Sequence, residues 1–232
     1  MKYILYFLFF LSLASCNTDT STPKEVSAGL KEYAAILGNF NFNFSRVKET
    51  NTSGKTQHLI SVTVFKNPIL EEADKDMISA FSSGIAYYIY KNLSEKQLKK
   101  IDGIAVKINL DNIESSQTYK KEDLATIQKF HNISESYIQF VKDFDIKSMY
   151  SAYGSFVQNE LNLEAFEKMM LSGFEDDFLE NVLLVGAGFF QEEDGLVVHL
   201  RYVVIYENNN NRRHSIYYYT DDGDTLIDGF QL

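Results

Sequence analysis

Glycine-containing runs are the first places to look for nucleotide chemistry in this chain. The SGKT run at residues 53–56 ends like a phosphate-binding loop, but that loop needs a glycine where Glu49 stands. The GAG run at residues 186–188 begins like a dinucleotide-binding turn, yet Gln191 occupies the third glycine position and no helix is predicted after it. We interpret the first run as a hairpin turn and the second as a bulge or sharp bend in a strand.

The other nucleophiles and metal ligands are scattered along the chain. Ser45 and Lys48 have the Ser-x-x-Lys spacing of penicillin-recognising enzymes, but they end a predicted strand and the partner motifs are missing. The four histidines show no paired spacing, and there is one cysteine. The aspartates at 221, 222 and 224 lack the pattern of a calcium loop. We therefore expect no catalytic motif, no metal site and no cofactor.

His199 and Arg201 alternate with apolar residues in a predicted strand over residues 196–206. The more hydrophobic face of that strand should pack against the helices. Its residues are Val198, Leu200, Tyr202, Val204 and Tyr206. His199 and Arg201 belong to the opposite face, which we expect to be the outer face of the sheet. They form either an interface with another subunit or domain, or two ordinary surface residues, which is the commoner case.

An aromatic stripe at helical spacing precedes these strands. Its members are Tyr137, Phe140, Phe144, Tyr150, Tyr153 and Phe156. Together with Tyr202 they either line the mouth of a ligand pocket or pack as core, which is the commoner use of such a stripe. In the pocket interpretation, the tyrosine hydroxyls and Asp143 would orient the ligand.

Apolar periodicity divides the first half of the chain into alternating strands and helices. A helix over 26–37 precedes a hairpin of strands 40–48 and 58–65. A long helix over 71–92, a short helix over 95–100 capped by Ser94, and strands 103–110 and 117–119 follow. This β-β-α-β-β order predicts an antiparallel sheet with helices on one face. We assign residues 26–130 to an N-terminal α+β domain.

The second half reads as helices followed by long strands. Asn132 and Glu135 have capping-box spacing and predict a helix start. Asp145 restarts a helix that continues to residue 157, and Asn162 caps a helix over 163–171. The predicted strands are 181–190, 196–206, 213–220 and 226–232, with Asp222-Gly223 in a hairpin turn. We assign residues 131–232 to a C-terminal α+β domain, so both domains combine antiparallel sheets with packed helices.

The order of elements in this second half resembles the cystatin-like cone of the nuclear-transport-factor-2-like superfamily. The matching segments are the helices FVKDFDIKSMYSAYGSF and LEAFEKMM, the strands LVVHLRYVVIY and RRHSIYYYT, and the closing TLIDGF. The resemblance implies a cavity between helix and curved sheet. In ketosteroid isomerase and the polyketide cyclases of that group, a carboxylate moves a proton while a tyrosine steadies the enolate oxygen. Asp143 or Asp145 with Tyr150 or Tyr202 would take these roles, which makes a small-molecule isomerase or cyclase the alternative function.

The first sixteen residues, MKYILYFLFFLSLASC, have a basic start, a short apolar run and small residues before Cys16. This is the pattern of a signal peptide over residues 1–15, since a membrane span needs about 20 apolar residues. Leu13-Ala14-Ser15-Cys16 resembles the lipobox of bacterial lipoproteins. The resemblance implies cleavage before Cys16, a diacylglycerol on its sulfur and an acyl chain such as palmitate on its amine. Cys16 is the only cysteine, and lipidation accounts for it.

Polar residues dominate positions 16–25, which we interpret as a lipidated tether. Asn17, rather than an aspartate, favours the outer membrane. Without Lys2 the chain has a net charge of −11, which disfavours nucleic acid, and the lysine pairs at 99–100 and 120–121 look isolated. We expect a lipid-anchored exported protein that faces the periplasm or exterior. It would act as a non-catalytic binding or scaffolding module of the bacterial cell envelope, with an envelope protein or small apolar ligand as partner.

Overall fold

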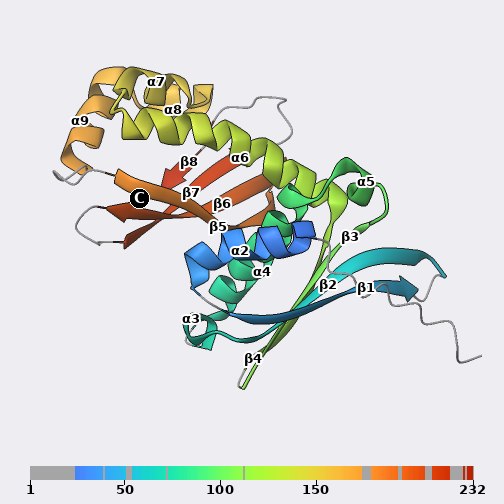
Figure 1. Ribbon diagram of the computed structural model, residues 1–232. Helices are drawn as coiled ribbons and strands as arrows, with labels where there is room; N and C mark the ends of the chain where they lie inside the picture. The colour runs from blue at the N-terminus through green and yellow to red at the C-terminus, as the bar shows by residue number, and fades with distance from the viewer. Residues whose placement is uncertain are drawn as a thin grey trace, which may run out of the picture.

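The computed structural model confirms the α+β class, with two four-stranded sheets and helices packed on them (Figure 1). The structure describes residues 24–38, 40–50, 54–71, 73–111, 113–173, 179–192, 195–206, 211–219, 227 and 229–231. The predicted signal peptide, the tether up to residue 23 with Cys16, and the predicted turn at 222–223 lie outside these residues. Among the described helices, none is long and apolar enough to cross a membrane.

The N-terminal half contains the predicted β-β-α-β-β order. Its elements are α2 (Lys24–Leu37), β1 (Asn41–Thr50), β2 (Thr56–Lys66), α3 (Pro68–Glu71), α4 (Lys75–Asn92), α5 (Glu95–Leu98), β3 (Gly103–Leu110) and β4 (Ile113–Lys120). The sheet order is β1-β2-β3-β4. Asp74 caps α4 by accepting a hydrogen bond from the backbone nitrogen of Met77, so this helix begins later than predicted.

The expectation of an antiparallel N-terminal sheet is wrong at its centre, because β2 and β3 run parallel. The pairs β1–β2 and β3–β4 are antiparallel, as predicted. Helix α4 connects the two central strands and has 18 residues, a length of about 27 Å at about 1.5 Å per residue. It returns the chain to the end of the sheet where β2 began, so β3 starts there and runs in the same direction.

The C-terminal half follows the predicted order of helices and then strands. Its elements are α6 (Lys121–Lys142), α7 (Ile146–Ser151), α8 (Ser155–Glu160), α9 (Leu163–Gly173), β5 (Leu179–Glu192), β6 (Gly195–Tyr206), β7 (Asn211–Tyr219) and β8 (Gly229–Gln231). The sheet order is β5-β6-β7-β8, with every neighbouring pair antiparallel. The predicted irregularity in the GAG strand is confirmed by a register shift between Leu184 and Gly186. This order is compatible with the cone, which stays a prediction.

The predicted helix start at Asn132 is wrong, because α6 runs without interruption from Lys121 to Lys142. Its buried residues Phe130, His131 and Ser134 flank Asn132, so tertiary packing carries the helix through the capping-box sequence. The predicted domain boundary between residues 130 and 131 therefore falls inside this helix.

The predicted caps at Asp145 and Asn162 are confirmed. Asp145 accepts a hydrogen bond from the backbone nitrogen of Ser148 at 3.2 Å, and Asn162 accepts one from that of Ala165 at 2.9 Å. The predicted helix over 146–157 is instead divided into α7 and α8. The backbone at Ala152 and Gly154 pairs with Ile227 at this break, which accounts for the interruption.

Helix α4 lies between the two sheets, with α2 beside it, while α6 covers the opposite face of the C-terminal sheet (Figure 1). Residues 80–90 of α4 are all buried. Close approach to β5 depends on glycine, since a Cβ on Gly84 would lie 2.0 Å from the carbonyl oxygen of Val185. A Cβ on Gly186 would lie 1.9 Å from the carbonyl oxygen of Ala80. One hydrophobic core therefore includes residues of both halves.

Candidate functional site

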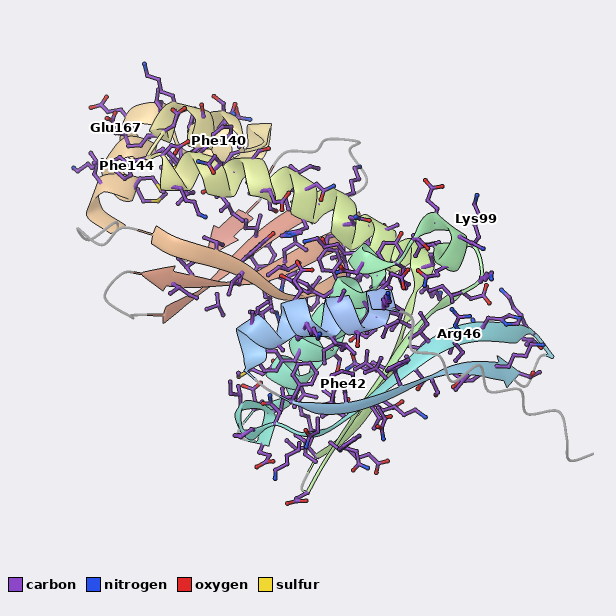
Figure 2. The ribbon with its side chains drawn as sticks, viewed as in Figure 1. Phe42, Arg46, Lys99, Phe140, Phe144 and Glu167 are labelled. Carbon is purple, nitrogen blue, oxygen red and sulfur yellow. The ribbon has the colours of Figure 1, made fainter. Side chains whose placement is uncertain are left out.

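The residues of the predicted aromatic pocket lie at different depths. Tyr137, Tyr153 and Tyr202 are buried at 2–3% exposure. Phe140 and Tyr150 are partly buried against the core, whereas Phe144 is 43% exposed. Phe140 and Phe144 lie at the outer end of α6 (Figure 2). A ligand pocket lined by this stripe stays a prediction.

Four buried tyrosine hydroxyls are hydrogen-bonded to partners inside the core. The bonded pairs are Tyr202 with His131 at 3.1 Å, Tyr218 with Ser134 at 2.7 Å, and Tyr137 with Tyr153 at 2.8 Å. Burial raises the pKa of Tyr137 to about 12 and raises that of Tyr202 well above its ordinary value. The hydroxyls of Tyr137 and Tyr202 are therefore neutral at pH 7. The contacts of Tyr202 and Tyr218 join α6 to the C-terminal sheet, whereas the contact of Tyr137 joins α6 to the segment after α7.

The aspartates of the isomerase alternative are exposed and contact residues near them in sequence. Asp143 accepts a hydrogen bond from Nε2 of Gln139 at 2.9 Å, and Asp145 accepts from Ser148 at the start of α7. Among the hydrogen bonds of the described residues, no carboxylate meets the hydroxyl of Tyr150 or Tyr202. The carboxylate–tyrosine pair required for enolate chemistry is therefore not assembled from these residues.

His199 and Arg201 lie on the sheet face opposite α6, as predicted, but helix α4 covers part of that face. His199 is only 7% exposed, and Arg201 donates a hydrogen bond from Nη1 to the backbone oxygen of Asp76 at 3.0 Å. The contact joins the C-terminal sheet to the first turn of α4. The face expected to be outer is thus in contact with the N-terminal half of the same chain.

These two residues line a cavity of about 350 Å³ between the start of α4 and the C-terminal sheet, which we call the arginine cavity. Its remaining lining residues are Asp74, Asp76, Met77, Ala80, Phe81, Val185, Tyr202, Val203, Ser215 and Tyr217. An apolar wall with a few polar groups, at a volume of about 300–1,000 Å³, is typical of small-ligand sites.

The histidine of the arginine cavity has a defined hydrogen-bonding state. Nε of Arg201 donates to Nδ1 of His199 at 3.5 Å, and Nε2 of His199 lies 2.8 Å from Oγ of Ser215. The ring also stacks on Tyr217, with centroids 4.4 Å apart. Burial, followed by the charge of Arg201, lowers the pKa of His199 to about 4. The ring is therefore neutral at pH 7.

This state argues against a serine–histidine catalytic pair. Because an arginine can only donate, Nδ1 of His199 is the acceptor and Nε2 carries the proton. In that tautomer the ring donates to Ser215, which is opposite to the arrangement in which a histidine accepts the serine proton. The cavity offers a cation, two aspartates, further hydrogen-bonding groups and apolar contact. Among the described residues, no group of three or more metal-ligating side chains is found.

A second hollow, which we call the basic groove, was missed in the sequence. Arg46, Val47, Lys48, His58, Leu59, Lys99, Lys100 and Ile101 line a volume of about 590 Å³. The interpretation of Lys99-Lys100 as an isolated pair is therefore wrong. The signal was present in the alternate positions of Arg46 and Lys48 within β1. Joining them to the lysine pair requires the parallel pairing of β2 with β3, which places the loop before β3 beside the start of β2.

No protein family model, curated protein or solved structure matches this chain. The function must therefore be inferred from the residues and geometry described above.

Proposed function

We propose that the protein is an exported lipoprotein, held to a bacterial membrane by acyl chains on Cys16, and that it acts there as a non-catalytic binding module. The observation that carries the anchor is the single cysteine of the chain, placed directly after the small residues of a lipobox-like signal. Two or more acyl chains, at about 0.8 kcal/mol per buried CH₂, give a stable membrane attachment.

Mass spectrometry of the native protein tests the anchor. The expected N-terminal peptide begins at Cys16 and carries the added mass of a diacylglycerol and one further acyl chain. Cys16→Ser should remove that mass and release the protein from the membrane fraction. An unmodified thiol at Cys16, or a mature start elsewhere, would exclude the anchor.

The arginine cavity supports the binding role. It has the volume and apolar walls of a ligand site. Its polar groups include the guanidinium of Arg201, the neutral ring of His199 and the hydroxyl of Ser215, which lies 2.8 Å from that ring. The occupant would be a small apolar ligand with an acceptor group, or a segment of an envelope protein that presents the same chemistry.

Site-specific photo-crosslinking in intact envelopes tests this cavity. A crosslinking amino acid at Met77, which lines the cavity, should capture the partner. The matched position is Glu167, which is exposed on α9 at the outer end of the helical layer (Figure 2). Equal capture from both positions, or none from Met77, would exclude the cavity as the binding site.

A further inference from the structure

The basic groove gathers basic side chains from segments far apart in the sequence. Arg46 and Lys48 come from β1, His58 from β2, and Lys99 and Lys100 from the loop after α5. Figure 2 shows Arg46 and Lys99 at the same end of the molecule, away from Phe144 at the other end. The remaining lining residues, Val47, Leu59 and Ile101, are apolar. The lining contains five basic side chains and no acidic one, although the whole chain is acidic.

The positive charges of this groove are available to a partner. Within the described part of the chain, no carboxylate lies within 4 Å of the charged nitrogens of Arg46, Lys48, Lys99 or Lys100. The nearby carboxylate of Asp102 accepts a hydrogen bond from the backbone nitrogen of His58 at 2.8 Å. That carboxylate holds the loop against β2. All five basic side chains are exposed.

The charge of the groove also acts on the start of α2, where the predicted tether joins the folded body. Helix α2 begins at Lys24. The pKa of the Glu25 carboxyl is lowered first by a backbone hydrogen bond, then by a hydrogen bond from Gln97 of α5 and by the charges of Lys24 and Arg46. The charge of Arg46 and the side chain of Gln97 thus both act on the carboxyl at the start of α2.

We propose that the basic groove docks on the anionic surface of the membrane that holds the lipid anchor, and that its ligands are the phosphate groups of anionic phospholipids. This proposal takes the anchor at Cys16 from the proposed function. Eight peptide links separate Cys16 from Lys24, so Lys24, at the start of α2, lies within about 28 Å of the anchored cysteine, at about 3.5 Å per link.

The net negative charge of the chain is compatible with this contact. Exposed charges farther away than the Debye length, about 10 Å at 0.1 M salt, are largely screened. The cations that touch the surface therefore dominate, and each Lys or Arg close to an anionic membrane contributes about 1 kcal/mol. The contact would orient the protein, with the groove toward the lipid and the outer end of α6 away from it.

Vesicle co-sedimentation of the full mature chain carrying Cys16→Ser tests the groove without the anchor. Binding to vesicles of phosphatidylglycerol and phosphatidylethanolamine should exceed binding to pure phosphatidylcholine, and should fall with salt. Lys99→Gln with Lys100→Gln should lower the partition coefficient about 25-fold, since about 1 kcal/mol per charge is about fivefold. Arg46→Gln with Lys48→Gln should have a similar effect.

The matched control is Lys142→Gln with Lys168→Gln, two exposed lysines of α6 and α9 with the same change in charge. It should bind as the parent does, and circular dichroism should show that all variants are folded. Equal binding to both vesicle types, no binding, or an equal loss in the control would overturn the proposal. Release by 10 mM inorganic phosphate at constant ionic strength, or tighter binding to duplex DNA, would assign the groove to another anion. Membrane release of the Cys16→Ser chain in cells tests the anchor separately.

Discussion

The basic groove and the arginine cavity both contain cationic side chains, which are exposed in the groove and held by hydrogen bonds in the cavity. In the cavity, Arg201 donates to the backbone of Asp76 and to His199, and the histidine is neutral. In the groove, the lysines and Arg46 project from exposed positions. We infer that a cationic side chain is most available to a charged partner where hydrogen bonds within its own chain do not hold it. The cavity suits a ligand recognised by shape and hydrogen bonds, and the groove suits an extended anionic surface.

The largest expected effect concerns the tight contact beside the arginine cavity. Gly186→Ala should destabilise the protein by about 3 kcal/mol or more, because the new Cβ would overlap the backbone oxygen of Ala80. The matched change at the groove end is Gly54→Ala, where no atom would lie within 4 Å of a Cβ and only the positive φ of 79° costs energy. That change should cost about 1 kcal/mol. Urea denaturation measures both, and equal losses would contradict the difference in packing.

The buried histidines should make stability depend on pH. Burial lowers the pKa of both His131 and His199 to about 4. The unfolded chain binds protons near the ordinary value of about 6.5, so the free energy of unfolding should fall as pH decreases from about 6.5 toward 4. We expect each histidine to contribute a loss of about 2 kcal/mol between pH 7.5 and 5, where carboxylates are still ionised. Urea midpoints at both pH values measure it, and a flat profile would refute it.

Arg201→Met should have a smaller effect on stability and a specific effect on His199. Loss of the hydrogen bond to Asp76 should cost about 1–2 kcal/mol. The pKa of His199 should rise, because the second cause of its depression is the charge of Arg201, but it should stay below 6.5 because burial remains. NMR titration of the ring protons measures this. Arg201→Lys keeps the charge and should leave the pKa low; a rise in that variant would show that charge is not the cause.

The smallest effect on stability is expected in the groove. Lys99→Gln with Lys100→Gln should change the free energy of unfolding by less than about 0.5 kcal/mol, since both side chains are exposed. A loss above 1 kcal/mol in thermal or urea unfolding would mean that the chain itself uses these charges, and the contrast between groove and cavity would disappear.

Local patterns in the sequence were sufficient for most elements but not for their pairing. Alternation in β1 and the capping residues Asp145 and Asn162 act over a few residues, so they were recognised. The start predicted at Asn132 failed because buried neighbours in α6 override a local cap. The parallel pairing of β2 and β3 depends on where a long helix returns the chain.

The candidate sites show the same difference between local patterns, which can be predicted, and long-range contacts, which cannot. His199 and Arg201 were found from the alternation in one strand, whereas their cover by α4 is a contact between residues 125 positions apart. The groove needs three segments at once, and no single window of sequence contains it. The aromatic stripe was visible, but burial of Tyr137, Tyr153 and Tyr202 beside exposed Phe144 depends on where α6 ends.

The position of helix α4 determines how the molecule should unfold. The helix packs against β3 and β4 of one sheet and against β5 of the other, and it also contacts α2 and α6. Removing the C-terminal half would expose the isoleucine, alanine and tyrosine side chains of α4 that pack against β5 to water. A fragment ending near residue 130 should therefore aggregate when expressed alone, and the intact chain should lose both sheets in a single calorimetric peak.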